Sequence, residues 1–323
     1  MIAKLAATAL LLTSLTVPAN AAPAGCTLTV LPPAPGTSEA VSKVDSGDST
    51  GRFLLGQSEL PDGSAMRPVL WDNGSPRFLD KEPGIWSEAY GVNSAGTVVG
   101  QTGDPTGGSH PWTWSNGTYT ELEPPAGVGQ PQLSGINNRG DVVGWGYSFA
   151  QGRSVTVVWP AGGEPVVLAA PYEAIAVGIS DQGVVVANVN GVGGYVWPDL
   201  QSAGRELPGL QKGYTRVQEV RGGWIGGTEE LADGTKAGLL WNSAGTAVAS
   251  RVRPVTSVNA NGDVSLAPGL DGSVIVGRDG TQYTLPQPTV IDHLTDRGRT
   301  VSAGGNDGFH AIAWSGCFPP DHT

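Results

Sequence analysis

The chain has 323 residues, a formal net charge of −11, only 15% charged residues and 49 glycines. The negative balance and the lack of a basic cluster argue against nucleic acid and anionic membranes as partners, because both need Lys and Arg to neutralise phosphates. Sparse charge, abundant glycine and no long helical periodicity are typical of an all-β protein rich in turns.

The N-terminal segment, residues 1–21, has the pattern of a secretory signal peptide. Lys4 supplies a positive start, residues 5–17 form an apolar run, and residues 19–21 (ANA) match an A-x-A cleavage site. The apolar run is too short to span a bilayer, which takes about 20 residues, and no later stretch is long enough. We therefore predict a secreted protein without a membrane span.

Two cysteines, Cys26 and Cys317, lie near opposite ends of the predicted mature chain. In an exported protein an even number of cysteines favours a disulfide, so we predict that these two are joined. The alternative is lipid attachment at Cys26, because residues 24–26 (AGC) match part of a bacterial lipobox. Pro23 stands where that motif has Leu, and the cysteine lies far from the apolar run, so the disulfide is the better interpretation.

A short pattern recurs along the chain. Residues 92–100 (VNSAGTVVG) return as 136–144 (INNRGDVVG) and again as 179–187 (ISDQGVVVA). Each copy is followed by a polar loop and then by a short strand that carries a Trp. A period of roughly 40 residues, built from short strands and Gly turns, is typical of a β-propeller.

One repeat unit is predicted to contain four antiparallel strands, clearest at residues 87–93, 97–102, 110–114 and 118–122. Alternating β-branched and aromatic residues support each strand. The turn between the first two strands begins with Asn, Ser, Asp or Thr, which caps its own backbone, and has Gly three residues later for the positive φ. An Asn-Gly pair at 116–117 predicts a hairpin between the last two strands.

The same unit can be laid along the whole chain, and we predict an all-β, seven-bladed β-propeller with four antiparallel strands per blade. The Trp holds one equivalent strand position in six units and is expected to pack between blades: Trp71, Trp114, Trp159, Trp197, Trp241 and Trp314. The unit around residues 258–285 is degenerate, with Gly277 at the Trp position. If this unit is an insertion, six blades remain.

The two ends of the chain carry complementary irregularities. The last unit stops at Cys317 without a fourth strand, whereas residues 27–32 look like a fourth strand without a unit. We predict that the N-terminal strand completes the last blade and closes the ring, which removes exposed sheet edges. Residues 22–318 would then form one propeller domain, residues 319–323 a short tail, and the disulfide would replace the missing turn.

The clearest unit resembles a known repeat family. Residues 89–100 (AYGVNSAGTVVG), followed by residues 110–122 (HPWTWSNGTYTEL), are similar to the repeat of the HAF family of bacterial extracellular proteins. The resemblance extends over essentially the whole predicted mature chain, is closest in the second and third units, and is weak in the fifth and sixth. It implies a secreted repeat protein, and it implies no activity or catalytic residue for this chain.

No residue pattern points to catalysis, a cofactor or a metal. His110 and His310 share a repeat position with an expected polar surface role, and His293 lies on an innermost strand, where it either faces the central channel or serves the structure. Zinc spacing and a complete calcium loop are both missing, as is a Gly-x-Ser-x-Gly nucleophile elbow. Two acids for glycoside hydrolysis need only converge in space, so that chemistry stays open.

Aromatic residues outside the repeat position are the best candidates for a binding surface. In propellers the loops between blades and the loops between the second and third strands share one face. Five residues of such loops are predicted to bind a ligand there, by stacking beside a carboxylate: Trp86, Trp145, Tyr147, Phe149 and Asp104. Ordinary loop packing is the alternative for all five.

These features together predict a secreted, monomeric binding module or interaction scaffold for extracellular carbohydrate or a cell-envelope polymer, without evident catalysis. A scaffold for extracellular protein–protein interaction is the first alternative, and a propeller-fold glycoside hydrolase or lyase is the second. An aromatic patch that binds protein but not glycan would favour the scaffold. An acid pair near the channel mouth, essential for turnover, would favour the enzyme. The fold alone does not decide among them.

Overall fold

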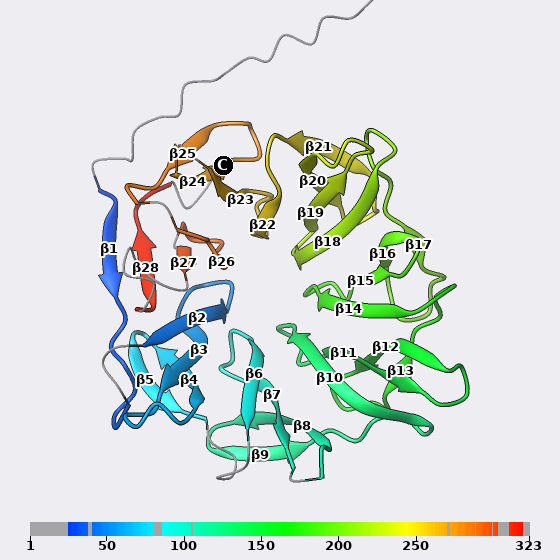
Figure 1. The fold of residues 1–323 in the computed structure, drawn as a ribbon, viewed down its shortest axis with the longest axis horizontal. Coiled ribbons are helices and arrows are strands. Elements are labelled where there is room, and N and C mark those ends of the chain that lie inside the picture. Colours follow the sequence, from blue (N-terminus) through cyan, green and yellow to red (C-terminus); the bar gives the residue numbers. More distant parts are fainter. Residues whose placement is uncertain are drawn as a thin grey trace, which may run out of the picture.

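The computed structural model describes residues 25–37, 41–79, 86–104, 106–269, 272–287, 289–298, 300–302 and 310–318. Over these residues the chain forms strands, turns and loops, and no helix among them is long and apolar enough to cross a membrane. The predicted all-β propeller architecture is confirmed (Figure 1). The predicted signal peptide, 1–21, and tail, 319–323, lie outside the described residues.

Within the described residues the strands form seven four-stranded antiparallel sheets around a common centre (Figure 1). Six sheets use four consecutive strands each, and we number them blades 1–6 in chain order. Blade 1 contains β2 (Ser42–Gly47), β3 (Phe53–Glu59), β4 (Met66–Asp72) and β5 (Ser75–Phe78). Blade 2 contains β6 (Ser87–Val92), β7 (Val98–Gly103), β8 (Ser109–Ser115) and β9 (Thr118–Glu121). Blade 3 contains β10 (Val128–Ile136), β11 (Val142–Ser148), β12 (Arg153–Trp159) and β13 (Val166–Val167).

The next three blades follow the same plan. Blade 4 contains β14 (Ala174–Ile179), β15 (Val185–Val189), β16 (Gly193–Trp197) and β17 (Arg205–Glu206). Blade 5 contains β18 (Tyr214–Arg221), β19 (Trp224–Glu230), β20 (Lys236–Asn242) and β21 (Ala247–Arg251). Blade 6, the degenerate unit, contains β22 (Val255–Val258), β23 (Val264–Gly269), β24 (Gly272–Val276) and β25 (Gln282–Thr284).

The remaining sheet, here called the composite sheet, joins the two ends of the chain. It contains β1 (Thr27–Val30), β28 (Ile312–Ser315), β27 (Thr300–Ser302) and β26 (His293–Leu294), in that order. Thr27 lies opposite Ser315, and Val30 lies opposite Ile312. The predicted disulfide Cys26–Cys317 is confirmed beside this pair of strands. Its sulfur atoms are bonded to each other, so Cys26 has no thiol to carry a lipid.

The core consists of apolar layers between neighbouring blades, and the repeated Trp lies in these layers as predicted. All six repeat tryptophans are buried. The indole N–H of Trp159 donates to the carbonyl oxygen of Glu123, that of Trp197 to Ala169, and that of Trp241 to Pro208, each at 2.8–2.9 Å. A buried Trp needs a partner for this donor, and these acceptors all lie after the last strand of the preceding blade.

The inner turns, which join the first and second strands of a blade, have the predicted chemistry. In blade 2 the Oδ1 atom of Asn93 accepts the backbone N–H groups of Ala95 and Thr97. Gly96 has a φ of 78°, a left-handed conformation that favours glycine. The Asn side chain therefore replaces backbone hydrogen bonds that the turn would otherwise lack.

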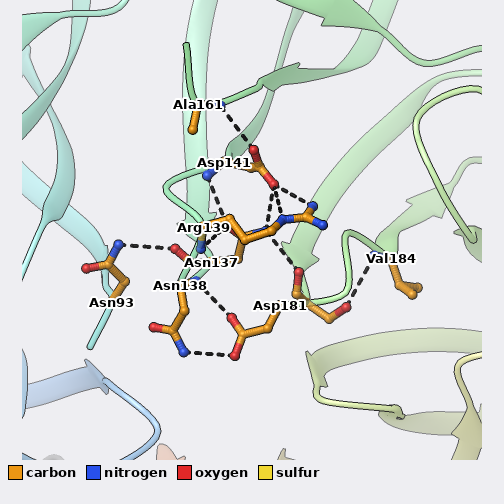
Figure 2. A network of polar contacts seen from close by, with 9 residues as sticks. Asn93, Asn137, Asn138, Arg139, Asp141, Ala161, Asp181 and Val184 are labelled. Carbon is orange, nitrogen blue, oxygen red and sulfur yellow. Dashed lines mark hydrogen bonds and ion pairs between the residues drawn. The ribbon is translucent and has the colours of Figure 1, made fainter. Parts of the chain in front are cut away.

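The same Asn side chain also joins one blade to the next (Figure 2). The Nδ2 atom of Asn93 donates to the carbonyl oxygen of Asn137 at 3.1 Å, and the Nδ2 atom of Asn137 donates to that of Ser180 at 3.0 Å. On the exposed side, Asn138 donates its backbone N–H and its amide N–H to the two carboxylate oxygens of Asp181. The repeated Asn thus has a structural role in the propeller.

This chain of turn contacts continues through other blades. The backbone N–H of Ala260 in blade 6 donates to Asp296 in the composite sheet at 2.7 Å, and the N–H of Asp296 donates to the carbonyl of Ser49 in blade 1. Ser94 of blade 2 then donates to the carboxylate of Asp48. We call this whole set of contacts between inner turns the turn belt. It runs from blade 6 through the composite sheet and blades 1, 2 and 3 to blade 4.

Blade 5 departs from this pattern because its inner turn has Gly222 in place of the usual sequence. Its connection to blade 6 is made by Glu219 instead, whose carboxylate accepts the hydroxyl of Ser257 and the N–H of Val258 at 2.6 and 2.9 Å. A carboxylate bound by two donors of the next blade replaces the Asn contact.

Candidate functional site

Two surfaces of the propeller can bear function, and they lie at opposite ends of the blades. The inner turns lie at one end. Since consecutive strands are antiparallel, the connections between blades and those between second and third strands lie at the other end. We call this second end the loop face, and the five residues predicted to bind a ligand lie in or beside its loops.

Trp86 and Asp104 lie together in blade 2. Trp86 is 37% exposed, and its ring covers Gly103, where an added Cβ would come within 2.1 Å of the indole Nε1. The carboxylate of Asp104 is held by its own loop, because its Oδ1 accepts the N–H groups of Thr106 and Gly108 at 2.7 and 2.9 Å. Little of this carboxylate remains for a ligand.

The second oxygen of Asp104 lies 2.9 Å from Nε2 of His110, whose Nδ1 lies 3.1 Å from Glu121. These two carboxylates, Asp104 first, raise the pKa of His110 above its usual value. Hydrogen bonds from Thr106 and from His110 lower the pKa of Asp104. His110, for which the sequence predicts a polar surface role, therefore forms an ion pair with Asp104 that fixes the loop between β7 and β8.

Trp145, Tyr147 and Phe149 follow one another along β11 into the next turn, yet their environments differ. Trp145 is partly buried and packs against the core layer between blades 3 and 4. Tyr147 and Phe149 are 39% and 70% exposed, and their rings meet edge to face with centroids 5.7 Å apart. The structure thus brings this last pair together on blade 3, apart from the blade 2 pair. Ligand binding by the five residues stays a prediction.

A surface hollow lies on the loop face where blades 3 and 4 meet. It is shallow, with a volume of about 580 Å³, and we call it the Tyr172 hollow after its most exposed aromatic lining residue, 59% exposed. Its lining comes from blades 3 and 4 and the connection between them: Arg153, Pro171, Tyr172, Glu173, Asn190 and Gly191. Tyr147 lies opposite Ser154 in the ladder, and the hydroxyl of Ser154 donates to Glu173 of the lining, so the aromatic pair and the hollow share one part of the loop face.

The polar groups of the Tyr172 hollow are held in place by neutral partners. Arg153 donates to the side-chain oxygen of Gln151 and to the carbonyl of Ala170 at 2.7–3.0 Å. Glu173 accepts the hydroxyl of Ser154 at 2.8 Å. A flat aromatic ring beside a guanidinium, a carboxylate and an amide offers both apolar contact and directed hydrogen bonds to a polar ligand.

Sequence reasoning missed Tyr172 and, further along the loop face, Tyr214, which is 43% exposed. Both precede or begin the first strand of a blade, where the repeat pattern has already ended and no periodicity marks the residue. A tyrosine after proline in a polar connection, as in Pro171-Tyr172, is the one signal that was available.

The centre of the molecule holds a second cavity, of about 390 Å³, lined by innermost strands and inner turns. Arg221 of blade 5 crosses this region. Its Nη2 donates to the carbonyl of Gly47 in blade 1 and to Nδ1 of His293 in the composite sheet, both at 3.0 Å, while its Nε pairs with Glu219. The arginine therefore connects elements on several sides of the centre.

His293 has the structural role rather than a position open to the channel, because it is only 1% exposed. Its ring packs on Gly47, where a Cβ would lie 2.8 Å from its Cδ2, and its Nε2 lies 3.0 Å from the carbonyl of Asp48. Burial, followed by the charge of Arg221, holds the pKa of His293 well below its usual value. A neutral ring with both nitrogens engaged is unsuited to proton transfer with a ligand.

Carboxylates border the central cavity, and the described contacts engage them. Asp181 is bound by Asn138, and Asp296 by Ala260, while Glu219 holds Arg221 and blade 6. Burial is the largest cause of a raised pKa at Asp296, with the charges of Asp181 and Glu219 adding to it. Among the described residues no group of three or more His, Cys, Asp or Glu side chains is arranged to hold a metal ion.

Comparisons with known proteins support the fold, and they do not identify a family or an activity. No protein-family model and no curated protein matches the chain. An uncharacterised protein from Listeria monocytogenes EGD-e is 11% identical with a TM-score of 0.55, over 85% of this chain and 94% of that one. A Pyrococcus horikoshii acylaminoacyl peptidase is 11% identical with a TM-score of 0.53, over 85% of this chain and 52% of that one. A prolyl endopeptidase is 13% identical with a TM-score of 0.53, over 76% and 41%.

The chain spans about half the length of these peptidases or less. At such low identities the likeness shows a shared propeller fold. The same fold carries many unrelated functions, so an activity of these neighbours is not evidence about this chain.

Proposed function

We propose that this protein is a secreted β-propeller module that binds extracellular carbohydrate or a cell-envelope polymer through the loop face of blades 3 and 4. The observation that carries the proposal is the Tyr172 hollow, which lies on the same part of the loop face as the exposed Tyr147–Phe149 pair. Sugars present flat C–H faces that stack on aromatic rings and hydroxyl groups that bond to planar polar side chains. Exposed apolar patches rimmed by polar groups are a mark of interaction sites on protein surfaces.

Export and family membership are part of this proposal. The disulfide is consistent with an oxidising, extracellular location, because such bonds persist outside the cytosol. The repeat unit at 89–122 supports membership in the HAF-repeat family, and the turn belt explains why such a repeat keeps its Asn and Gly positions. We further propose that the composite sheet serves as the seventh blade, with β1 closing the ring.

A pull-down on insoluble chitin, cellulose and peptidoglycan tests the binding proposal with the mature, disulfide-bonded protein. The variant Phe149→Ala/Tyr172→Ala removes two exposed rings, and we expect it to lose most of the retained protein. Trp86→Ala tests the blade 2 pair separately. Val252→Ala is a matched control, because this apolar side chain is 85% exposed and lies away from the hollow.

The outcomes separate the candidate functions. Retention that Phe149→Ala/Tyr172→Ala loses and Val252→Ala keeps supports a glycan site at the hollow. Retention on none of the polymers, combined with cross-linking of the same face to a cell-surface protein, would replace the glycan by a protein partner and favour the scaffold alternative.

The hydrolase alternative would use the acids around the central cavity, where the raised pKa of Asp296 suits a proton donor. Its carboxylate, like those of Asp181 and Glu219, already forms contacts between blades. This engagement ranks binding ahead of catalysis. Release of reducing sugar from any of the three polymers, abolished by Asp296→Asn, would reverse the order.

A further inference from the structure

A second hollow lies beside the Tyr172 hollow on the loop face, in blade 5. It is open, has a volume of about 400 Å³, and we call it the Tyr214 hollow. Its lining comes from the start of β18 and the connection that follows β19: Lys212, Gly213, Tyr214, Arg216, Glu230, Leu231 and Ala232. Like the first hollow, it combines an exposed tyrosine with a cation and a carboxylate.

The two hollows occupy equivalent places in successive blades. In blade 4 the N–H of Asn190 donates to the carbonyl of Glu173, which brings the connection after β15 beside the start of β14. In blade 5 Tyr214 lies opposite Glu230, which joins the same two parts of the unit. The repeat has therefore produced two neighbouring sites of one kind.

A shared wall makes the hollows neighbours in space as well. The hydroxyl of Tyr214 points to the carbonyl of Val189 in blade 4 at 3.4 Å. Val189 is followed by Asn190 and Gly191, which line the Tyr172 hollow. A ligand that continues from one hollow to the next crosses this one turn, so the pair forms an extended surface suited to a linear chain.

The charges of the surface favour an anionic occupant. Over the described residues, Lys212 and Arg216 form no ion pair although both are exposed, and Arg153 bonds only to neutral oxygens. The nearby carboxylates already have partners, since Glu173 accepts Ser154 and Glu230 lies 3.5 Å from Lys236. The surface therefore presents cations that no described carboxylate neutralises, on a chain with a net charge of −11.

A buried carboxylate holds the loop that carries Lys212. Glu229 is fully buried, and it accepts the backbone N–H groups of Leu210, Gln211 and Gly213 at 2.7–3.0 Å. Lys212, in the middle of this loop, has a φ of 60°, a conformation that is uncommon outside glycine. Strain held by a buried network is found at sites where a side chain is positioned in advance of binding.

We infer that the ligand is a linear acidic polysaccharide that spans both hollows, with sugar rings on Tyr172 and Tyr214 and sugar carboxylates bound by Lys212 and Arg216. The inference rests on the proposed function and narrows its ligand class. Carboxylates repeat along such a polymer at each acidic sugar, and charge-assisted hydrogen bonds to them are about twice as strong as those to hydroxyl groups.

Calorimetric titration with galacturonate oligomers tests the inference, with the fully methyl-esterified oligomer of equal length as the uncharged match. We expect the acidic hexamer to bind about tenfold or more tightly than its ester, and galacturonate monomer to bind more weakly than the hexamer. Raising the salt concentration should weaken binding of the acidic hexamer and leave binding of the ester unchanged, because only the charged contacts are screened.

Variants assign the effect to residues. Lys212→Ala/Arg216→Ala should abolish the preference for the acidic hexamer while ester binding remains, and Lys212→Arg/Arg216→Lys should restore most of it. Arg297→Ala, which removes an exposed cation from an inner turn of the composite sheet, is the control and should bind like the unchanged protein. Equal melting temperatures show that each variant is folded.

Failure of the inference differs from failure of the proposed function. Equal binding of acid and ester, or a preference that survives Lys212→Ala/Arg216→Ala, overturns the acidic ligand while a glycan site remains. Equally tight binding of poly-glutamate also overturns it, because charge alone would then suffice. Binding of neither oligomer, together with no retention on the insoluble polymers, contradicts the proposed function itself.

Discussion

At the residue scale, the buried Asn of the inner turn explains most of what repeats. Asn137 is 3% exposed, and its Oδ1 caps its own turn through the N–H groups of Arg139 and Asp141. Its Nδ2 reaches Asp141 and the carbonyl of Ser180 in the next blade. The cap was predictable from the sequence, since it lies within the turn. The contact with blade 4 was not, because its acceptor lies a full repeat away.

Asn137→Ala should lower the free energy of unfolding by about 2–3 kcal/mol, because it removes the cap and leaves buried partners unsatisfied. Asn138→Ala is the comparison, since this exposed neighbour loses its contacts to Asp181 in water and should cost about 1 kcal/mol or less. Urea unfolding measures both. Equal losses at the two positions would contradict the structural role of the buried side chain.

His110 gives a prediction about pH at the same scale. Its folded pKa is raised by Asp104 and Glu121, so its ion pairs contribute stability below the unfolded pKa of about 6.5 and lose it as the pH rises through the folded value. An NMR titration should show this raised pKa, and Glu121→Gln should move it back toward the ordinary value. A ring that titrates at or below 6.5 in the unchanged protein would argue that the pairs do not form.

At the scale of elements, β1 is an edge strand with little burial. All four of its residues are exposed, with Leu28 at 38% and Val30 at 54%, and it meets its sheet only along β28. A strand with so little burial gains little from the hydrophobic effect. Its place therefore depends on the ladder and on the disulfide at Cys26, the residue just before the strand.

Cys26→Ser should lower the free energy of unfolding by about 3–5 kcal/mol, because the disulfide closes a loop of 291 residues and constrains the unfolded chain. Chemical unfolding with and without reductant measures the loss. The reduced unchanged protein should match the variant. A variant as stable as the oxidised protein would show that the ladder alone secures β1.

Prediction from sequence succeeded where the repeat is regular and ended where it is interrupted. The strands and turns of blade 2 follow from alternation, the Asn-x-x-Gly turn and the Asn-Gly hairpin, which are local properties. The turn at Gly222 and the carboxylate of Glu219, which bonds to blade 6, depart from the repeat and so could not be predicted from it. Tyr172 and Tyr214 lie in connections without periodicity, so their common surface depends on how blades pack.

At the scale of the whole molecule, the centre is held by groups from blades 1 and 5 and the composite sheet. Arg221 contacts Gly47 and His293, which are 174 and 72 residues away in the chain. A cation facing a buried imidazole is stable only while the imidazole is neutral. The contact is therefore a point at which acid can loosen the propeller.

Lowering the pH below about 6.5 should destabilise the protein through His293. Its folded pKa is depressed, so the unfolded chain takes up a proton first, and stability falls by at most about 1.4 kcal/mol per pH unit below the unfolded pKa. His293→Gln should flatten the dependence between pH 7.5 and 5 in urea unfolding. The raised pKa of His110 makes its contribution to stability change with pH in the opposite direction. The test is therefore the difference in pH dependence between the unchanged protein and His293→Gln. An unchanged slope in the variant would contradict the assignment.

The pairing of β1 with β28 sets the order in which the molecule can be finished. During synthesis β1 is made among the first segments and its partner among the last, so the strand must wait for nearly the entire chain. Contacts between such distant segments form slowly and leave an unpaired edge exposed meanwhile. The pairing of β1 with β28 and the oxidation of Cys26 with Cys317 are thus the last steps of folding, and a chain interrupted before residue 310 would keep an early strand that has no partner.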